Sequence, residues 1–247
     1  MNIYVANVLA AIACIVGGYL LGSIPNGVII GKAFFHKDPR DYYSHNSGGT
    51  NVGRVLGKKV GILVIVLDAI KTSIPLFVSF AVLSFVPGIA KYMVWGNGYN
   101  AAPLWYWLSG FFALVGHCFP IYLGFRGGKA VSSFVGLEIF FSYIEVALFP
   151  ILFFGCLKKT KMVSISSIIA SSSCAVVTLA TSVALEALHL TDSIGYYLTW
   201  SFGGFYLEFG LEAGIICFLS AAVLVLRHIP NIIRIRNGSE SKISWMK

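Results

Sequence analysis

Six long apolar runs constrain the fold of this chain more than any other feature of its sequence. A helix needs about 20 predominantly apolar residues to cross the hydrocarbon layer of a membrane. Runs of this kind occur at Ile3–Ile30, Val60–Val86, Pro103–Leu123, Ala130–Leu157, Val163–Leu188 and Phe205–Leu226. Only 11% of the residues are charged, whereas a soluble domain carries about 25%. The sequence therefore predicts an all-α polytopic membrane protein.

The first run is not expected to be a cleaved signal peptide. It has no basic segment before it, and it continues through Gly22–Gly31 into a motif of its own. The five cysteines lie within or at the edges of apolar runs and form no CxxC pair, so we expect neither a disulfide framework nor a metal site.

The cations are concentrated in a few polar segments, and this predicts the orientation of the chain. Sixteen of the eighteen Lys and Arg residues fall in Lys32–Lys59, Arg126–Lys129, Lys158–Lys161 and Arg227–Lys247. Basic segments of this kind are retained in the cytoplasm. The net charge of +8 is therefore explained by membrane topology, and no nucleic-acid partner is expected.

The run Ala130–Leu157 conflicts with this rule if it crosses the membrane once, because Lys158–Lys161 would then lie outside. A hairpin of two short helices removes the conflict. Glu138 and Glu145 lie inside this run, and buried carboxylates tend to face protein or water. We therefore predict seven transmembrane helices, two of them short, in a single membrane-embedded domain over residues 1–247. The N-terminus is expected outside and the C-terminus in the cytoplasm.

The basic segments mix cations with glycines and small hydroxyl or amide side chains, which is the composition of phosphate sites. Glycine lets the backbone approach an anion closely, and successive N–H groups cradle its oxygens. The segment Asp38–Arg54 is richer in such donors than a connector requires. Arg126-Gly-Gly-Lys129 at a helix start predicts a second phosphate-binding turn. The ATP-binding pattern GxxxxGK[ST] is absent from the sequence.

Other polar positions allow two interpretations each. Pro25 in Gly22-Ser-Ile-Pro-Asn-Gly27 predicts a helix break, which by itself is common in membrane helices. Asp68 and Lys71 lie on one face of a helix. A structural pair is favoured over a lysine that binds an anion. His117 fits a packed histidine as well as a functional one.

Two later segments add to this pattern. Ser164 and Ser167 lie on one side of a helix start, where serines also pack between helices routinely. His228, Asn231 and Arg234 recur every three residues, so they share a helix face. This spacing is more specific than a basic patch that contacts anionic lipid.

Together these segments resemble the bacterial acyl-phosphate:glycerol-3-phosphate acyltransferase family in their order and spacing. That family has a GSIPxG segment, an arginine before an SxNxGxTN loop, a GHxFPxxLxFxGGK loop, a serine pair and a RHxxNIxR tail. The matching residues here are Gly22–Gly27, Arg40 with Ser44–Asn51, Gly116–Lys129, Ser164 with Ser167, and Arg227–Arg234 followed by Gly238 and Glu240.

The resemblance implies transfer of an acyl group from acyl phosphate to the 1-hydroxyl of sn-glycerol 3-phosphate. The products would be 1-acyl-glycerol 3-phosphate and phosphate, in the first step of phospholipid synthesis. The partners would be acyl phosphate, glycerol 3-phosphate and membrane lipid, at the cytoplasmic face of the cell membrane. No cofactor, metal, acyl-CoA or acyl carrier protein is expected.

The resemblance also implies the site residues. His228 and Asn231 would act in catalysis by orienting the glycerol hydroxyl. His228 is a candidate base, and the departing phosphate is the alternative. The residues expected to bind substrate or phosphate are Ser23, Arg40, Ser44, Asn46, Gly48, Thr50, Asn51, Lys71, His117, Gly127, Gly128, Lys129, Ser164, Ser167 and Arg234.

The chain departs from the family pattern at several positions. The family has GSGN where this sequence has Tyr43-Ser-His-Asn46, and glycine where it has Ala130. Pro230 lies inside the tail helix and should kink it.

The alternative function is a membrane transporter of an organic phosphate or another anion. A transporter should place its cations near the middle of the bilayer, so the clustering of cations in polar loops favours the enzyme.

Overall fold

The computed structural model describes residues 2–199, 201–202 and 205–243. Two compact units divide the chain, Met1–Leu137 and Glu138–Lys247, and each is described by itself. The prediction of a single domain stays a prediction. Residues 244–247 of the basic tail lie outside the described part.

The helices of the first unit, in chain order, are α1 (Ile3–Gly22), α2 (Asn26–Phe35), η1 (Pro39–Asp41), α3 (Gly49–Leu56), α4 (Lys58–Phe85), α5 (Pro87–Ala90), α6 (Ala102–Cys118) and η2 (Ile121–Leu123). Helix α7 (Val131–Phe141) joins the two units. The elements of the second unit are α8 (Tyr143–Thr160), α9 (Val163–Ala187), η3 (Thr191–Gly195), α10 (Tyr196–Leu198), β1 (Ser201–Phe202), β2 (Phe205–Tyr206), α11 (Leu211–Arg227) and α12 (Ile229–Arg236).

Within the described part, the regular elements are helices apart from β1 and β2, two short strands that pair antiparallel, and an isolated bridge joins Val94 to Asn100. The all-α prediction is therefore confirmed for the body of the protein. One boundary was wrong: the last apolar run was expected to begin at Phe205, but this residue belongs to β2 and the helix begins at Leu211.

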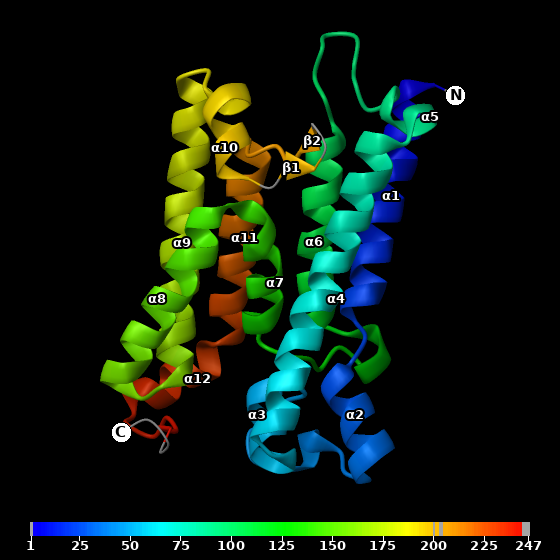
Figure 1. Cartoon of the computed structure of the whole chain (residues 1–247). Helices are drawn as coiled ribbons and strands as arrows, with labels where there is room; N and C mark the ends of the chain where they lie inside the picture. The colour runs from blue at the N-terminus through cyan, green and yellow to red at the C-terminus, as the bar shows by residue number, and fades with distance from the viewer. Residues whose placement is uncertain (1, 200, 203–204, 244–247) are drawn as a thin grey trace. The chain divides into compact units, whose positions relative to one another are not determined.

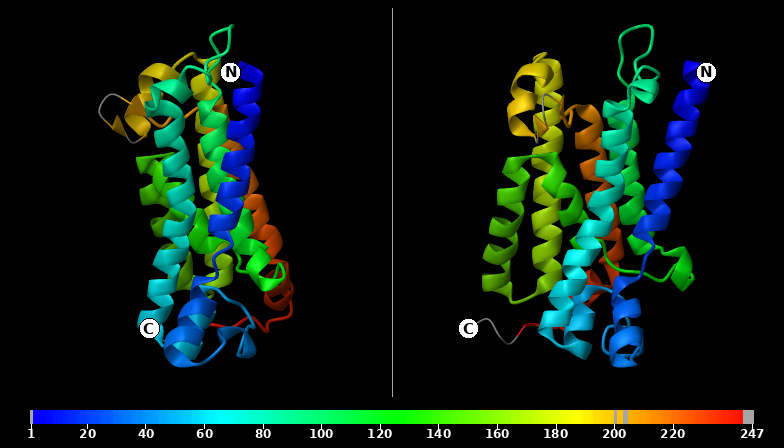
Figure 2. Two further views of the ribbon diagram at one scale, coloured as in Figure 1. Left: turned by 90° about the vertical axis from the view of Figure 1, so that its right-hand side faces the viewer. Right: turned by 45° about the vertical axis from the view of Figure 1, so that its right-hand side comes forward.

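Three long helices of the first unit, α1, α4 and α6, pack side by side (Figures 1 and 2). Glycines let α1 lie directly against the backbone of α6. A Cβ atom at Gly22 would lie 2.0 Å from the carbonyl oxygen of Ala113, and one at Gly18 would lie 2.2 Å from that of Ser109. Small residues at close crossings are typical of membrane helix packing.

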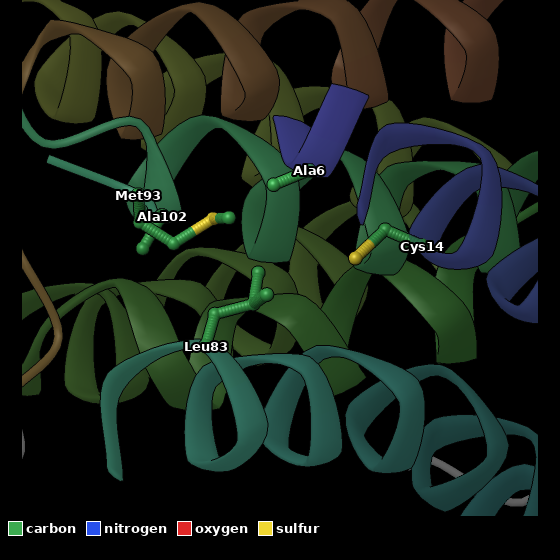
Figure 3. Close-up of a cluster of buried hydrophobic side chains, with 5 residues drawn as sticks. All are labelled: Ala6, Cys14, Leu83, Met93 and Ala102. Atoms are coloured by element: carbon green, nitrogen blue, oxygen red, sulfur yellow. The ribbon is translucent and has the colours of Figure 1, made fainter. Parts of the chain in front are cut away.

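The end of this unit that carries the N-terminus has a small hydrophobic core. Its buried side chains, drawn in Figure 3, are Ala6, Cys14, Leu83, Met93 and Ala102. Asn7 is also buried here. Its Nδ2 atom donates to the carbonyl of Tyr92 at 2.8 Å, and its Oδ1 atom accepts from Nε1 of Trp105 at 2.8 Å. Both ends of this buried amide are therefore satisfied by distant segments.

The predicted break at Pro25 is confirmed, but Pro230 does not lie in the interior of a helix as predicted. Helix α1 ends at Gly22 and α2 begins at Asn26, so Pro25 separates them, although the first apolar run was expected to continue to Ile30. Helices α11 and α12 meet at His228 with a bend of 54°, and Pro230 lies in the first turn of α12, where a missing N–H costs little.

In the second unit, α9 packs against both α8 and α11. The carboxyl groups predicted inside the hairpin run face protein. Thr178 of α9 donates to Glu145 at 3.0 Å, and Cys217 of α11 lies 3.4 Å from an oxygen of Glu138. Ser142 also donates to Glu145. These contacts give Glu145 and one oxygen of Glu138 partners inside the protein, whereas Oε2 of Glu138 finds none among the described residues.

Within the described residues, four helical segments are long and apolar enough to cross a membrane, and the bent pair α11–α12 raises this number to five. The four are Ile3–Phe35, Lys58–Phe85, Ala102–Leu123 and Val163–Ala187. The run predicted to form a hairpin is indeed split at Ser142 into α7 with 11 residues and α8 with 18. The protein is thus a helical membrane protein. Its seven spans and the sides of its termini stay predictions.

Candidate functional site

The polar segments of the first unit gather at one end. Figure 1 shows α2 and α3 at the end opposite the N-terminus and α5. The segment between these two helices carries Arg40, Ser44 and Asn46. A hydrogen bond of 3.3 Å from Nδ2 of Asn46 to the carbonyl of Gly127 joins this segment to the turn that follows α6. The structure therefore brings together the two loops that were predicted separately as phosphate sites.

Arg40 is oriented by Asp38. The Asp38 carboxylate accepts from Nε of Arg40 at 3.0 Å and from Nη2 at 2.7 Å. It also accepts from the backbone N–H of residue 40 and lies 3.3 Å from Nζ of Lys32. These hydrogen bonds from Arg40 hold the pKa of Asp38 well below its usual range, and the carboxylate raises the pKa of Arg40. The guanidinium is thus a fixed, permanently charged group with further N–H donors available to an anion.

Asn51 lies beneath the same loop. Its Oδ1 atom accepts from the N–H of Ser44 at 3.1 Å and from the Ser44 hydroxyl at 2.9 Å. Its Nδ2 atom donates to the carbonyls of Pro39 at 2.7 Å, Asn46 at 2.9 Å and Tyr42 at 3.3 Å. Asn51 is only 2% exposed, so the structure places it under the loop rather than at its surface.

The remaining loop residues have different surroundings. Ser44 and Thr50 are exposed. The backbone N–H of Gly48 donates to Oδ1 of Asn46 at 2.7 Å, so Gly48 and Asn46 close a tight turn ahead of α3. Asn46 thus uses both polar atoms of its side chain to bind backbone groups. Its Oδ1 atom binds within its own loop, and its Nδ2 atom binds the turn after α6.

Seven described non-glycine residues have a left-handed backbone, and three of them lie at departures from the family pattern. The φ angles are 51° at Tyr43, 52° at His45 and 66° at Ala130. These are the positions where the sequence replaces glycines of the resembled family, so the substitutions keep a conformation that glycine adopts more readily. Nδ1 of His45 lies 2.8 Å from the carbonyl oxygen of Arg40, a contact that glycine could not make.

The turn after α6 is built differently from the predicted phosphate cradle. The N–H of Gly127 donates to the carbonyl of Cys118 at 3.2 Å, and the N–H of Gly128 donates to that of His117 at 3.0 Å. A Cβ atom at Gly128 would lie 1.9 Å from Nε2 of His117. Both glycines therefore serve close packing against the end of α6, and the charge of this turn is carried by the exposed Arg126 and the half-buried Lys129.

A small, partly open cavity lined mostly by polar residues lies at the break between α1 and α2. It has room for about one water molecule. The residues that line it are Ser23, Pro25, Asn26, Ser47, Asp68, Lys71, His117 and Pro120. Three residues predicted from separate segments, Ser23, Lys71 and His117, thus meet at one place.

The charged groups of this cavity are paired. Nζ of Lys71 lies 3.0 Å from Asp68 and donates to the carbonyl of Ile24 at 2.6 Å. Asp68 also accepts from Asn26 at 3.0 Å, and Nδ1 of His117 lies 3.8 Å from the same oxygen. The predicted pairing of Asp68 with Lys71 is confirmed. Lys71 also caps a carbonyl that the break after α1 releases.

In the second unit, Glu240 gathers three of the predicted site residues. It accepts from the Ser164 hydroxyl, from Nδ2 of Asn231 at 2.7 Å and from Nε of Arg234 at 2.8 Å. Burial favours the neutral carboxyl, but these hydrogen bonds and the Arg234 charge together lower the pKa of Glu240. Asn231 also donates to Ser164 at 2.7 Å.

Asn231 and His228 are both buried. Among the described residues, Oδ1 of Asn231 finds no hydrogen-bond partner, which leaves an acceptor for an incoming hydroxyl. Nδ1 of His228 lies 2.8 Å from the carbonyl oxygen of Leu224. In a neutral ring, Nδ1 then carries the proton and Nε2 is the basic nitrogen. The Ser167 hydroxyl donates to the carbonyl of Val163 in its own helix at 2.9 Å.

The predicted residues thus fall into two sets, one in each unit. The first joins Arg40, Ser44 and Lys129 through the two linked loops, and the second joins Ser164 and Asn231. Sequence reasoning left out Asp68 and Glu240 as site residues. Both are acidic residues that lie near basic residues in the sequence, and this pattern could have identified them as carboxylates that hold the neighbouring cations in place. Among the described residues, no group of three or more His, Cys, Asp or Glu side chains could hold a metal ion.

Comparison with known proteins identifies the family. Residues 12–238 match the model of the glycerol-3-phosphate acyltransferase family. Glycerol-3-phosphate acyltransferases of Staphylococcus haemolyticus and Staphylococcus aureus are 37% and 35% identical to this chain, and each alignment covers 92% of the chain and 95% of the relative.

Two solved structures are also similar. The integral membrane glycerol 3-phosphate acyltransferase PlsY (YgiH) in its glycerol 3-phosphate form is 27% identical, with a TM-score of 0.70, over 95% of this chain and 96% of that one. Its lysophosphatidic acid form is 26% identical with a TM-score of 0.68, over 95% of each chain. From the motifs, the fold and these relatives, we conclude that the chain belongs to the glycerol-3-phosphate acyltransferase family.

Proposed function

We propose that this protein transfers an acyl group from acyl phosphate to the 1-hydroxyl of sn-glycerol 3-phosphate. The glycerol oxygen forms a bond to the acyl carbon, and the bond from that carbon to the phosphate oxygen breaks. The hydroxyl proton leaves with the phosphate, either directly or through a base. The products are 1-acyl-glycerol 3-phosphate and inorganic phosphate, which open phospholipid synthesis.

The observation that carries this proposal is the junction of the two cationic loops of the first unit. Arg40 is fixed by Asp38, and the Asn46 contact to Gly127 ties its loop to the turn that bears Lys129. Both substrates carry phosphate, and two cations on joined loops provide charge for such groups. Nearby cations and N–H groups also stabilise the charge that develops on the acyl oxygen during attack. Phosphate is already a good leaving group, so no covalent enzyme intermediate is required.

The second set of residues suits the acceptor. In this proposal Oδ1 of Asn231, which lacks a partner among the described residues, accepts a hydrogen bond from the glycerol hydroxyl. Nε2 of His228 is the nitrogen that can take up the hydroxyl proton. Ser164 and Arg234, both held by Glu240, would bind the glycerol phosphate group. Ser167 is the alternative to Ser164.

The donor chain defines the setting. An acyl chain can lie in lipid between apolar helices while its phosphate contacts polar loops at the membrane surface. We propose that these loops face the cytoplasm of the cell membrane, with seven spans, an outer N-terminus and an inner C-terminus. The clustering of Lys and Arg in these loops supports this orientation.

Donor identity is tested with purified protein, labelled glycerol 3-phosphate and one acyl donor at a time. We expect labelled lysophosphatidate with acyl phosphate, and none with acyl-CoA or acyl carrier protein. Product formed equally well from acyl-CoA would contradict the donor assignment while leaving the acceptor in place.

The role of His228 is tested by His228→Ala at saturating concentrations of both substrates. Loss of a positioned base lowers turnover by roughly 100-fold or more. Near-normal turnover would eliminate His228 as the base and leave the departing phosphate as the proton acceptor. The Leu224 contact is made by Nδ1, so His228→Asn provides a variant that can keep this hydrogen bond without the basic nitrogen.

The orientation is tested by cysteine labelling in intact cells at exposed positions. Lys59→Cys and Lys158→Cys should both be protected from an impermeant reagent, and Asn97→Cys should be labelled. Labelling of Lys158→Cys from outside would show that α7 and α8 cross the membrane as one span, against the hairpin.

The transporter alternative gains no support from these observations. A transport site needs a cation near the middle of the bilayer. Lys71 lies within the apolar helix α4, but Asp68 and the carbonyl of Ile24 already engage its ammonium group.

A further inference from the structure

Asn51 organises the loop that carries Arg40 and Ser44, although its own side chain is buried beneath that loop. Its amide makes five contacts of 3.3 Å or less, all of them to residues from Pro39 to Asn46. A primary amide has two N–H donors and one carbonyl acceptor. Every polar atom of this side chain is thus used within the protein, and none is directed at a ligand.

The loop needs such an anchor because its backbone is strained. Tyr43 and His45, on either side of Ser44, both have left-handed φ angles. L-residues with a side chain avoid this region unless the surrounding structure compensates for it. Asn51 supplies that compensation from inside, since it binds carbonyls before and after Ser44 as well as the N–H of Ser44 itself.

The contacts of Asn51 are also aimed at the groups expected to bind anions. The N–H and hydroxyl of Ser44 converge on Oδ1 of Asn51. If the hydroxyl proton rotates to a phosphate oxygen, the N–H contact still holds the residue in place. The carbonyl of Pro39 bonds to Nδ2 at 2.7 Å, which fixes the peptide that precedes Arg40.

We propose that Asn51 is a positioning residue for the acyltransfer reaction, which holds Ser44 and Arg40 in their phosphate-binding geometry. This replaces direct contact with phosphate as the role of Asn51. The inference rests on the proposed function, in which these two residues bind substrate phosphate.

The test compares Asn51→Ala with Asn7→Ala, a matched control. Asn7 is a buried asparagine of the same unit, and its amide also bonds to distant segments, but it lies near the start of α1, close to the N-terminus. Thermal unfolding should show a loss of stability in both variants. Steady-state kinetics should show a KM for acyl phosphate or for glycerol 3-phosphate raised roughly tenfold or more in Asn51→Ala alone, as expected for loss of a charge-assisted contact.

A double-mutant cycle with Ser44→Ala separates positioning from general loosening. If Asn51 acts through Ser44, the two changes together raise KM by less than the product of their separate effects. Multiplying effects, or a KM raised equally in Asn51→Ala and Asn7→Ala, would overturn the proposal.

A binding measurement makes the result independent of turnover. Inorganic phosphate that binds the folded protein raises its unfolding temperature. The shift should be present in wild type and in Asn7→Ala, and largely lost in Asn51→Ala. A phosphate shift without turnover would contradict the proposed function, and loss of that shift in Asn51→Ala would then still show that Asn51 positions the phosphate-binding groups. A full shift in Asn51→Ala, or no shift in wild type, would overturn the positioning role.

Discussion

Replacement of Asp68 by Asn removes one half of the buried ion pair in α4. Asp68 and Lys71 are both buried, with Nζ 3.0 Å from the carboxylate. The new amide oxygen can still accept from Asn26, and Lys71 keeps its 2.6 Å contact to the carbonyl of Ile24. The change therefore removes charge compensation while it leaves the shape and part of the hydrogen bonding in place.

Loss of one partner from a buried ion pair costs about 3–5 kcal/mol, because the remaining charge is left without compensation. The retained Ile24 carbonyl places Asp68→Asn near the lower value, about 3 kcal/mol. For a chain of this size that corresponds to a fall of roughly 6–12 °C in the unfolding temperature. Removal of the stranded cation as well, in Asp68→Asn with Lys71→Met, should return the free energy of unfolding to within about 2 kcal/mol of wild type.

Thermal unfolding in detergent, followed by circular dichroism, measures these differences, and acyltransfer by the same samples separates the two roles of Lys71. If Lys71 is structural, the double variant regains activity together with stability. If it binds an anion, stability returns without activity. An unfolding temperature unchanged in Asp68→Asn, or losses that simply add in the double variant, would refute the ion-pair reasoning.

Three further predictions concern the loops and the tail. Gly128→Ala should destabilise the protein by about 1–3 kcal/mol, because its Cβ would lie 1.9 Å from the ring of His117; Gly155→Ala, in open space on α8, is the control and should not destabilise in the same melts. Tyr43→Gly should stabilise the protein by up to about 1 kcal/mol in chemical denaturation, since φ is 51° and the side chain is exposed; a loss of stability would contradict the strain argument. The folded-state pKa of Glu240 is lowered, so the ionised carboxylate should stabilise the fold above the unfolded pKa of about 4.3. This stabilisation should disappear as the pH falls through the folded-state pKa. In Glu240→Gln the free energy of unfolding should depend less on pH over that acidic range, and an unchanged pH dependence would count against this network.

Features that depend on local chemistry could be predicted from the sequence. The break at Pro25 follows from a missing N–H and a fixed φ. The Asp68–Lys71 pair follows from helical spacing, since residues three apart share a face. The split of the fourth apolar run followed from the placement of Lys158–Lys161, because cations are retained on one side of a membrane.

Features that depend on tertiary contacts could not be predicted. Glu240 bonds to Ser164 across 76 positions of sequence, and no local pattern encodes that distance. Glycine permits several backbone orientations, so the sequence could not tell that the N–H groups of Gly127 and Gly128 bond to the end of α6 rather than point at a ligand. The helix start at Leu211 was missed because strand β2 is as apolar as the helix that follows it.

The central claim is that acyl transfer from acyl phosphate to glycerol 3-phosphate is the reaction of this protein. The most direct measurement is phosphate release by purified protein supplied with acyl phosphate, with and without glycerol 3-phosphate. We predict release that depends on glycerol 3-phosphate and is matched by an equal amount of lysophosphatidate. No release from a folded sample, or release that is independent of glycerol 3-phosphate, would contradict the account.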